Sequence, residues 1–188
     1  MPMIITGISG SARRASYNTA LLHAAAGLSP DGVEVRALTI AGIPLYDGDV
    51  EAESGIPAAV AAMKEAIASA DGLLLVTPEY NNSIPGPFKN AIDWCSRPGA
   101  DIPRVFGGKP VALIGASPGG FGTILSQTAW LPVLRTLGCE LWTGGRLMVA
   151  GAGRVFDDSG ALVDAGVAER LRSFVQGFNE HVRAHAAR

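Results

Sequence analysis

Features that mark secreted, membrane-embedded and metal-binding proteins are scarce in this chain of 188 residues. Its two cysteines, Cys95 and Cys139, are far apart and fit neither a CxxC motif nor a metal-binding cluster, so we expect two small buried side chains and no metal site. No apolar run approaches the roughly 18–20 residues of a membrane span. The N-terminus lacks the basic segment of a signal peptide. We therefore expect a cytoplasmic protein that does not enter a membrane.

The chain also lacks a strong charge of either sign. Its net charge is −2 and its pI is about 5.9, which argues against a global attraction for nucleic acid or anionic membranes. Any anion-binding site must therefore be local. The composition, 48% hydrophobic and 17% charged, is typical of a folded protein. With no repeat and no linker, residues 1–188 are expected to form a single domain.

Short apolar runs alternate with helical patterns along the chain. Strands are predicted over residues 3–9, 33–40, 72–78, 109–117 and 139–143. Helices are predicted over residues 16–28 (with Ser16 as N-cap), 57–70, 86–96, 128–138 (with Pro132 near the first turn) and 167–185. Residues 41–57 are predicted to be a long loop. This βαβαβαβαβα order predicts a five-stranded parallel sheet with helices on both faces.

Three loops follow predicted strands at the edge where such sheets bind ligands. They cover residues 9–16, 78–86 and 116–123. Each has an unusual composition, rich in Gly, Ser, Pro, Arg or Asn. Because the carboxyl ends of parallel strands meet at one edge, we expect these three loops to form one site.

The first loop, "GSARRAS", favours an anion. It precedes a helix N-terminus, which attracts negative charge. Ser11 and Ser16 add hydroxyl groups, Asn18 adds an amide, and Arg13 can grip phosphate with two charge-assisted hydrogen bonds. The spacing matches neither GxxxxGK[ST] nor GxGxxG, so a monophosphate is the better fit. The alternative is a solvated loop with two surface arginines, and Arg14 is expected to face solvent.

The second loop lies in "TPEYNNSIPGPFKNAIDW", residues 77–94. Tyr80 offers a flat ring for a planar ligand. Its prolines predict a rigid backbone whose polar groups can face a heterocycle. Glu79 is the obvious acid or base, but it has no visible partner, which favours an orienting role.

The third loop contains "GASPG", which matches the G-x-S-x-G nucleophile elbow of hydrolases. A triad would join Ser117 to Asp157, Asp158 or Asp164 and to His181 or His185. Both histidines lie on the predicted terminal helix, where a surface histidine is the ordinary expectation, and "GGFGT" is not a clear helix. A hydrolase would also leave the first two loops without a role.

The chain resembles the NAD(P)H-dependent FMN reductase family, the flavodoxin-like quinone, chromate and azo-dye reductases. The resemblance rests on "GSARRASYN" and "PEYNNSIPGPFKNAIDW", with support from "IPLYDGDVE" and "GKPVALIGASPGGFGT", and it covers nearly the whole chain. It implies a flavodoxin-like three-layer sandwich with strand order 2-1-3-4-5. It also implies an FMN site in which the phosphate contacts Ser11, Arg13, Ser16, Tyr17 and Asn18. The isoalloxazine would lie against Pro78, Glu79, Tyr80 and Asn81, completed by Ser117, Gly119 and Gly120.

The resemblance further implies a ping-pong reaction with NADPH or NADH as electron donor. A small oxidant such as a quinone, azo compound, chromate or free flavin would be the acceptor, and no catalytic acid, base or metal is required. The Gly-rich "SPGGFGT" departs from many relatives, so Phe121 is expected to reshape the acceptor pocket. A flavodoxin-type electron carrier is the alternative, but the small net charge and the loop arginine argue against it.

Relatives in this family form dimers or tetramers, so the resemblance implies a homodimer or homotetramer. The interface candidates are Tyr46 and the apolar face of Trp130, Leu131, Val133 and Leu134. Core packing explains that apolar face equally well.

Overall fold

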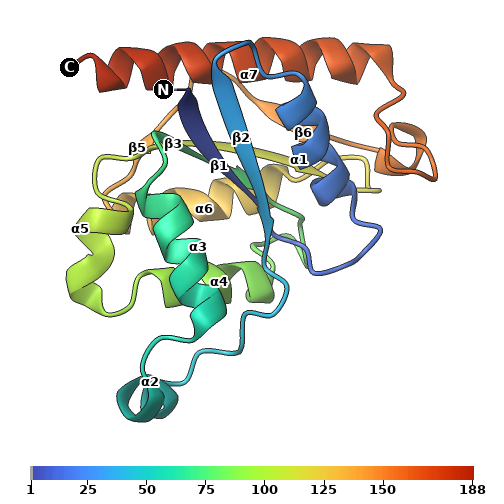
Figure 1. The fold of residues 1–188 in the computed structure, drawn as a ribbon. Coiled ribbons are helices and arrows are strands. Elements are labelled where there is room, and N and C mark those ends of the chain that lie inside the picture. The colour runs from blue at the N-terminus through green and yellow to red at the C-terminus, as the bar shows by residue number, and fades with distance from the viewer. Residues whose placement is uncertain (1) are drawn as a thin grey trace.

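Leu73, Leu74, Leu75 and Val76 point alternately to the two faces of a central parallel sheet, and each side chain is buried. The computed structural model describes residues 2–188, drawn in Figure 1. The strands are β1 (Met3–Ser9), β2 (Val33–Thr39), β3 (Gly72–Val76), β4 (Pro110–Ala116), β5 (Glu140–Leu141) and β6 (Leu147–Val149). Their order is β2-β1-β3-β4-β5, and β6 also pairs with β4. The predicted parallel sheet and strand order are confirmed.

The fifth strand position differs from the prediction because two short strands share it. Glu140 pairs with Pro110 at the start of β4, whereas Leu147 pairs with Ile114 near its end. The intervening segment leaves the sheet, and Trp142 packs edge-on against Phe174 at a ring distance of 4.9 Å. The predicted strand over 139–143 therefore ends early, and β6 was missed.

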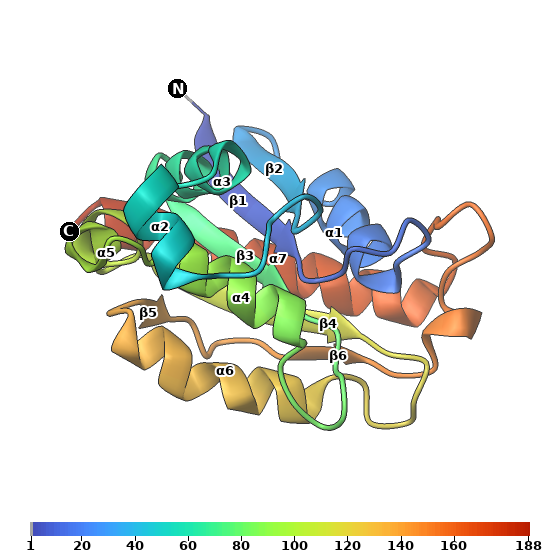
Figure 2. The same ribbon diagram turned by 90° about the horizontal axis from the view of Figure 1, so that it is seen from below.

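Helices cover both faces of the sheet, as predicted (Figure 2). The α-helices are α1 (Tyr17–Gly27), α2 (Gly48–Ser54), α3 (Ala58–Ala68), α4 (Gly86–Cys95), α5 (Ile102–Val105), α6 (Ile124–Thr136) and α7 (Ala165–Ala186). Short 3-10 turns cover Gly99–Asp101 and Ala152–Arg154. One apolar cluster lies between the sheet and α1 and α7, and the other lies between the sheet and α3 to α6. No helix within residues 2–188 is long and apolar enough to span a bilayer.

One predicted helix has wrong bounds, and one predicted loop contains a helix. Helix α6 begins at Ile124 instead of residue 128, so Pro132 lies inside it and not near its first turn. The predicted loop over 41–57 contains α2, whose N-cap Asp47 accepts a hydrogen bond from the Asp49 N–H at 2.9 Å. Periodicity could not reveal α2, because none of its residues is buried.

The segment that carries α2 projects from the rest of the fold (Figure 1) and is held at its base. Asn90 accepts a hydrogen bond from the Tyr46 N–H at 2.8 Å, and its amide donates to the Pro44 carbonyl at 2.8 Å. The Tyr46 ring packs edge-on against Trp94 at 4.9 Å. These contacts fix the projecting segment through α4.

Core packing accounts for most of the apolar α6 face that the sequence offered as an interface. Trp130 and Leu134 are 0% and 1% exposed. Both side chains belong to the core of the chain, so the prediction that they contact a second subunit is wrong. Val133 packs against the same core cluster. Leu131 and Tyr46 stay exposed, at 44% and 40%.

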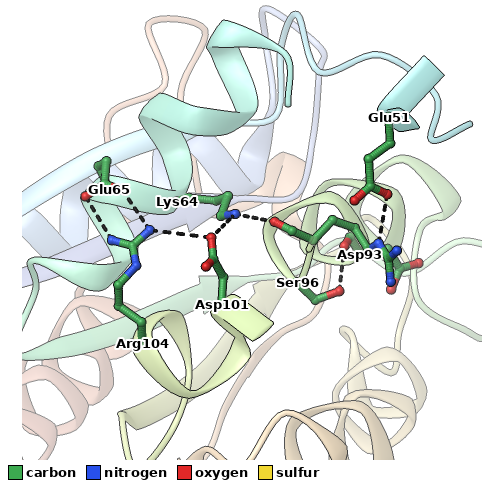
Figure 3. Close-up of polar contacts among 8 residues, drawn as sticks. Glu51, Lys64, Glu65, Asp93, Ser96, Asp101 and Arg104 are labelled. Carbon is green, nitrogen blue, oxygen red and sulfur yellow. Dashed lines mark hydrogen bonds and ion pairs between the residues drawn. The ribbon is translucent and has the colours of Figure 1, made fainter. Parts of the chain in front are cut away.

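Buried Lys64 joins α3 to the turn that follows α4 (Figure 3). Its ammonium group donates to Asp101 at 2.7 Å and to the Arg97 carbonyl, and this contact holds the pKa of Asp101 below its ordinary value. We expect Lys64→Met to lower the free energy of unfolding by about 2 kcal/mol, because both acceptors lose their donor.

Urea unfolding measures this effect, with Lys89→Met as the matched control. Lys89 pairs with Asp93 at 2.7 Å, but both side chains are more than a third exposed, so we expect that control to lose less than about 0.5 kcal/mol. Equal losses in the two variants would contradict a specific role for the buried amine.

Candidate functional site

The loops after β1, β3 and β4 meet around a depression of about 80 Å³. It is lined by Ser11, Arg13, Ser16, Tyr17, Asn18, Pro78, Glu79, Tyr80, Ala116, Ser117 and Pro118. Three segments that are far apart in sequence therefore converge at the carboxyl edge of the sheet, where parallel folds bind ligands. Of the predicted site residues, Asn81, Gly119 and Gly120 do not line this depression. Ala116 and Pro118 were missed, although both belong to the third predicted loop.

The loop after β1 is shaped for a close approach to its neighbours. Gly10 donates its N–H to the Val76 carbonyl at 2.9 Å, and a Cβ at Gly10 would lie only 2.0 Å from the Phe88 ring. Ser16 caps α1 as predicted, because its hydroxyl accepts the N–H groups of Asn18 and Thr19 at 3.2 and 3.3 Å. The loop thus leads directly into a helix N-terminus.

Asn18 joins this loop to the end of β4. Its amide donates to the Ala116 carbonyl and accepts the Ala116 N–H, both at 2.9 Å, and the residue is 4% exposed. The side chain therefore aligns two walls of the depression. This contact links residues 98 positions apart, which the sequence did not reveal.

Arg13 lines the depression and is exposed. Among residues 2–188 no carboxylate pairs with its guanidinium group. Within the same described range, the backbone N–H groups of Arg14 and Ala15 have no protein acceptor. A free cation and free N–H donors beside a helix N-terminus suit a phosphate.

Arg14 faces a different space from the depression. It lines a groove of about 800 Å³ along α1, together with His23 and Asp158, and it is exposed as predicted. Arg13 borders both the groove and the depression. Arg14 is therefore a matched control for Arg13 in binding experiments.

The loop after β3 makes a tight turn from Tyr80 to Ser83. The two residues exchange backbone hydrogen bonds of 3.1 Å, and Asn81 and Asn82 have φ angles of 49° and 62°. Two consecutive left-handed residues are typical of a type I′ turn, in which Asn is favoured. Tyr80 is 45% exposed, so its ring is available to a ligand.

The Glu79 carboxylate caps α6. One oxygen accepts the Leu125 and Ser126 N–H groups at 2.9 and 3.0 Å, and Thr123, the residue before α6, makes no capping side-chain bond of its own. A carboxylate is stabilised at this positive end of a helix. Glu79 thus has an orienting contact, as the sequence favoured, and fixes the turn against α6.

A buried network of side-chain hydrogen bonds lies under this contact. The Thr77 hydroxyl is 2.8 Å from the Ser126 hydroxyl and accepts the Trp130 indole N–H at 3.1 Å. Thr77, Ser126 and Trp130 are all 0% exposed. This hydrogen-bond network was not predicted, because each of its residues, taken alone, is ordinary for a core or a loop.

Ser117 is not assembled into a hydrolase triad with the terminal histidines. Its hydroxyl accepts the Gly119 N–H at 3.1 Å. His181 and His185 lie 3.1 and 3.0 Å from Glu140, which pairs with Pro110 at the opposite end of β4 from Ser117. Seven strand residues separate these ends by about 20 Å. The candidate acids also have other contacts: Asp157 closes a turn with Ser159, and Asp164 caps α7.

Ionisation of the Glu140 carboxylate should make the stability of the fold depend on pH in the acidic range. The Arg188 hydrogen bond is the main cause of its lowered pKa, and His185 adds to the effect. Because the Glu140 pKa is lower in the folded protein, the ionised carboxylate stabilises the fold at pH values above its unfolded-state pKa of about 4.3. This stabilisation is lost as the pH falls through the lower, folded-state pKa. We therefore expect Glu140→Gln to have a lower melting temperature than the parent at pH 7, with the difference shrinking below about pH 4. A difference that is constant from pH 7 to pH 3 in thermal unfolding would contradict this account.

The two thiols are unsuited to nucleophilic chemistry. Burial raises the pKa of Cys95 and of Cys139 to about 12, so both stay protonated at neutral pH. The part of the chain that the structure describes holds no metal-ligating group of three or more His, Cys, Asp or Glu side chains. The depression thus has the exposed guanidinium group of Arg13 on one side and the accessible aromatic ring of Tyr80 on another.

Comparison with known proteins agrees with this geometry. Residues 3–153 match the model of the family described as NADPH-dependent FMN reductase. The chain is 43% identical to the NAD(P)H-dependent FMN reductase PA1204 of Pseudomonas aeruginosa, covering 95% of each chain. It is 39% identical to the 2-hydroxy-1,4-benzoquinone reductase of a Burkholderia species, covering 97% of this chain and 98% of that one.

A solved structure extends the likeness to the whole fold. FerB, a flavoenzyme NAD(P)H:(acceptor) oxidoreductase from Paracoccus denitrificans, aligns with a TM-score of 0.86 and 32% identity over 97% of this chain and 98% of that chain. Family match, sequence identity and fold together place this chain in the NADPH-dependent FMN reductase family.

Proposed function

We propose that the chain is an FMN-dependent oxidoreductase that transfers electrons from NADPH or NADH to quinones or similar small oxidants. The observation that carries the proposal is the convergence of Arg13, Tyr80 and Ser117 on one depression at the carboxyl edge of the sheet. The family membership and the reductase names of its relatives support the same reaction class.

The residues present fit FMN. Its phosphate would be held by Arg13, the Ser11 and Ser16 hydroxyls and the start of α1. The unpaired guanidinium group and the free N–H donors beside it support this assignment. The isoalloxazine would lie between the Pro78–Asn81 segment and the Ser117–Gly120 segment, with Tyr17 beside the phosphate. Bound FMN supplies the hydride chemistry between the nicotinamide and the acceptor, so the protein need only bind and orient the reactants.

The chain's own groups then have defined tasks. The Tyr80–Ser83 turn presents backbone polar groups in a fixed direction, because both central residues are left-handed. Glu79 holds that turn against α6, and Asn18 keeps the phosphate loop aligned with β4. No side chain is required to exchange a proton with the nicotinamide. Donor and acceptor would use the same space in turn, which gives ping-pong kinetics.

The test is a visible absorption spectrum of the purified holoenzyme without oxygen. We expect a flavin band that bleaches when NADPH or NADH is added and returns when a quinone follows. Flavin that stays oxidised with both nicotinamides would contradict the reductase and favour an electron carrier. A protein that takes up no FMN would overturn the proposal altogether.

We also propose that the enzyme works in the cytoplasm as a homodimer or homotetramer. Both cysteines are free, which agrees with a reducing compartment. The projecting segment exposes Leu45 and Val50, at 82% and 43%, so it is the best candidate for contact with a second copy. Sedimentation equilibrium of the parent and of Leu45→Ser tests this, and a monomeric parent would contradict it.

A further inference from the structure

The α1 groove is the hollow of about 800 Å³ that adjoins the depression along helix α1. The two hollows share Arg13, Ser16 and Tyr17 in their walls. Small-molecule sites commonly have volumes of about 300–1,000 Å³, whereas the depression has only about 80 Å³. The α1 groove therefore continues the proposed phosphate site into a space that can hold a ligand of nucleotide size.

The groove has two walls, one formed by α1 and the loop before it, the other by a tight turn over residues 156–162. In both Figure 1 and Figure 2 this turn, coloured orange, lies on the α1 side of the fold. Asp157 closes the turn, because its carboxylate accepts the Ser159 N–H at 2.9 Å and the Ser159 hydroxyl at 2.7 Å. The turn also approaches the helix, since a Cβ at Gly160 would lie 3.7 Å from the Ala20 side chain. The second wall therefore has a defined shape and lies close to α1.

The two walls of the α1 groove carry opposite charges. The first wall carries Arg13 and Arg14, and the second carries two carboxylates, those of Asp157 and Asp158. Arg14 is exposed, and among residues 2–188 no carboxylate pairs with its guanidinium group. Over the same described residues no cation pairs with the Asp158 carboxylate. The groove thus presents a cation without an ion-pair partner on one wall and such a carboxylate on the other.

These charges define the chemistry of a ligand that fits the groove. A guanidinium group binds a phosphate through two charge-assisted hydrogen bonds. Carboxylates on the facing wall would repel a polyanion, but they accept hydrogen bonds from ribose hydroxyls, as the acidic residue of dinucleotide-binding folds does. The His23 ring and the Ala20 methyl group also line the groove and offer a base a surface to pack on. A nucleoside phosphate carries all three kinds of group.

We propose that the α1 groove binds the adenosine phosphate of a dinucleotide cofactor, with Arg14 as its phosphate-binding residue. Adenosine is the nucleoside because both dinucleotides of this redox chemistry, FAD and NAD(P)H, carry it. FAD contains FMN as one half, so its second phosphate and its adenosine would continue past Arg13 into the groove. NADPH or NADH would instead reach the groove from the nicotinamide. The wall that the two hollows share favours FAD. This inference rests on the proposed function, since it extends the assigned FMN phosphate site.

The first measurement compares the Kd values of FMN and FAD for the full-length apoprotein by isothermal titration calorimetry. With the parent, FAD should bind at least about tenfold more tightly than FMN, because it adds a phosphate contact with a guanidinium group. Arg14→Ala should raise the FAD Kd about tenfold and change the FMN Kd by less than about threefold. Arg183→Ala is the matched control, because Arg183 is also exposed but lies in the last turn of α7. This control should leave both Kd values unchanged.

The second measurement tests the nicotinamide dinucleotide as the source of the adenosine phosphate. NADP⁺ is titrated into the oxidised FMN-loaded protein, whose flavin it cannot reduce. If the groove binds the adenosine phosphate of FAD, Arg14→Ala should change the NADP⁺ Kd by less than about threefold. NADP⁺ binding that Arg14→Ala weakens about tenfold, with FMN and FAD bound equally well by the parent, would keep the groove as an adenosine phosphate site and assign it to NADPH.

Two other results overturn the proposal. Unchanged Kd values for both FAD and NADP⁺ in Arg14→Ala would remove the adenosine phosphate from the groove. An equal loss of FAD affinity in Arg14→Ala and Arg183→Ala would show a general effect of net charge and not a site. Failure of the proposed function is distinct, because the parent would then bind neither FMN nor FAD, or its bound flavin would not bleach with NADPH and NADH.

Discussion

Arg13→Ala is expected to raise the Kd for FMN by about 10- to 100-fold, because hydrogen bonds to charged groups are worth about 1.5–3 kcal/mol. The Arg13 guanidinium borders the depression and is paired with no carboxylate of residues 2–188. Its removal therefore costs ligand affinity without breaking an ion pair of the fold. Titration of the apoprotein, followed by quenching of flavin fluorescence, gives the constant directly.

Two controls make the Arg13 result specific. Arg14→Ala removes the same charge from the neighbouring position, which lines the α1 groove but not the depression, and should change the FMN Kd by less than about threefold. Arg13→Lys keeps the positive charge but cannot form the bidentate hydrogen bonds of a guanidinium group to a phosphate. The Kd of this variant for FMN should therefore lie between those of the parent and Arg13→Ala. Full FMN affinity in Arg13→Ala would remove the phosphate from this loop.

Asn18→Ala is expected to lower the free energy of unfolding by about 3 kcal/mol, since it leaves two buried backbone groups without partners. Those groups are the Ala116 N–H and carbonyl, each 2.9 Å from the Asn18 amide. The variant should also bind FMN more weakly, because the loop that we propose holds the phosphate loses its connection to β4. Urea unfolding of the apoprotein separates the stability effect from ligand binding.

Asn90→Ala is a close control for Asn18. Asn90 also accepts one backbone N–H and donates to one carbonyl, both at 2.8 Å, but these bonds are exposed to solvent. Water can replace them, so the expected loss is at most about 1 kcal/mol. Equal losses in Asn18→Ala and Asn90→Ala would contradict the importance of the buried clamp.

Much of the fold could be predicted from local patterns. The buried runs of β1, β3 and β4 carry continuous apolar sequence, and Ser16 is followed by a regular helical pattern, so their positions were clear. The three site loops followed from the rule that ligands bind at the carboxyl edge of a parallel sheet. The strand order came from the resemblance.

The structural features that could not be predicted from the sequence depend on contacts between residues far apart in the chain. Helix α6 starts four residues early because Glu79 caps it from a loop 46 residues away. The Asn18 clamp joins positions separated by 98 residues. Strand β6 has only three residues, too few for a periodic pattern, and forms because β4 offers it an open edge. Tertiary pairing decided each of these features.

The most direct test of the account is to compare FMN with riboflavin as ligands of the apoprotein. Riboflavin has the same ring and ribityl chain but no phosphate, so the comparison isolates the role assigned to the Ser11–Asn18 loop. We expect riboflavin to bind the parent protein at least about 100-fold more weakly than FMN, and the difference to shrink in Arg13→Ala. Equal affinity of the parent for the two flavins would contradict the central claim that this loop holds the cofactor phosphate.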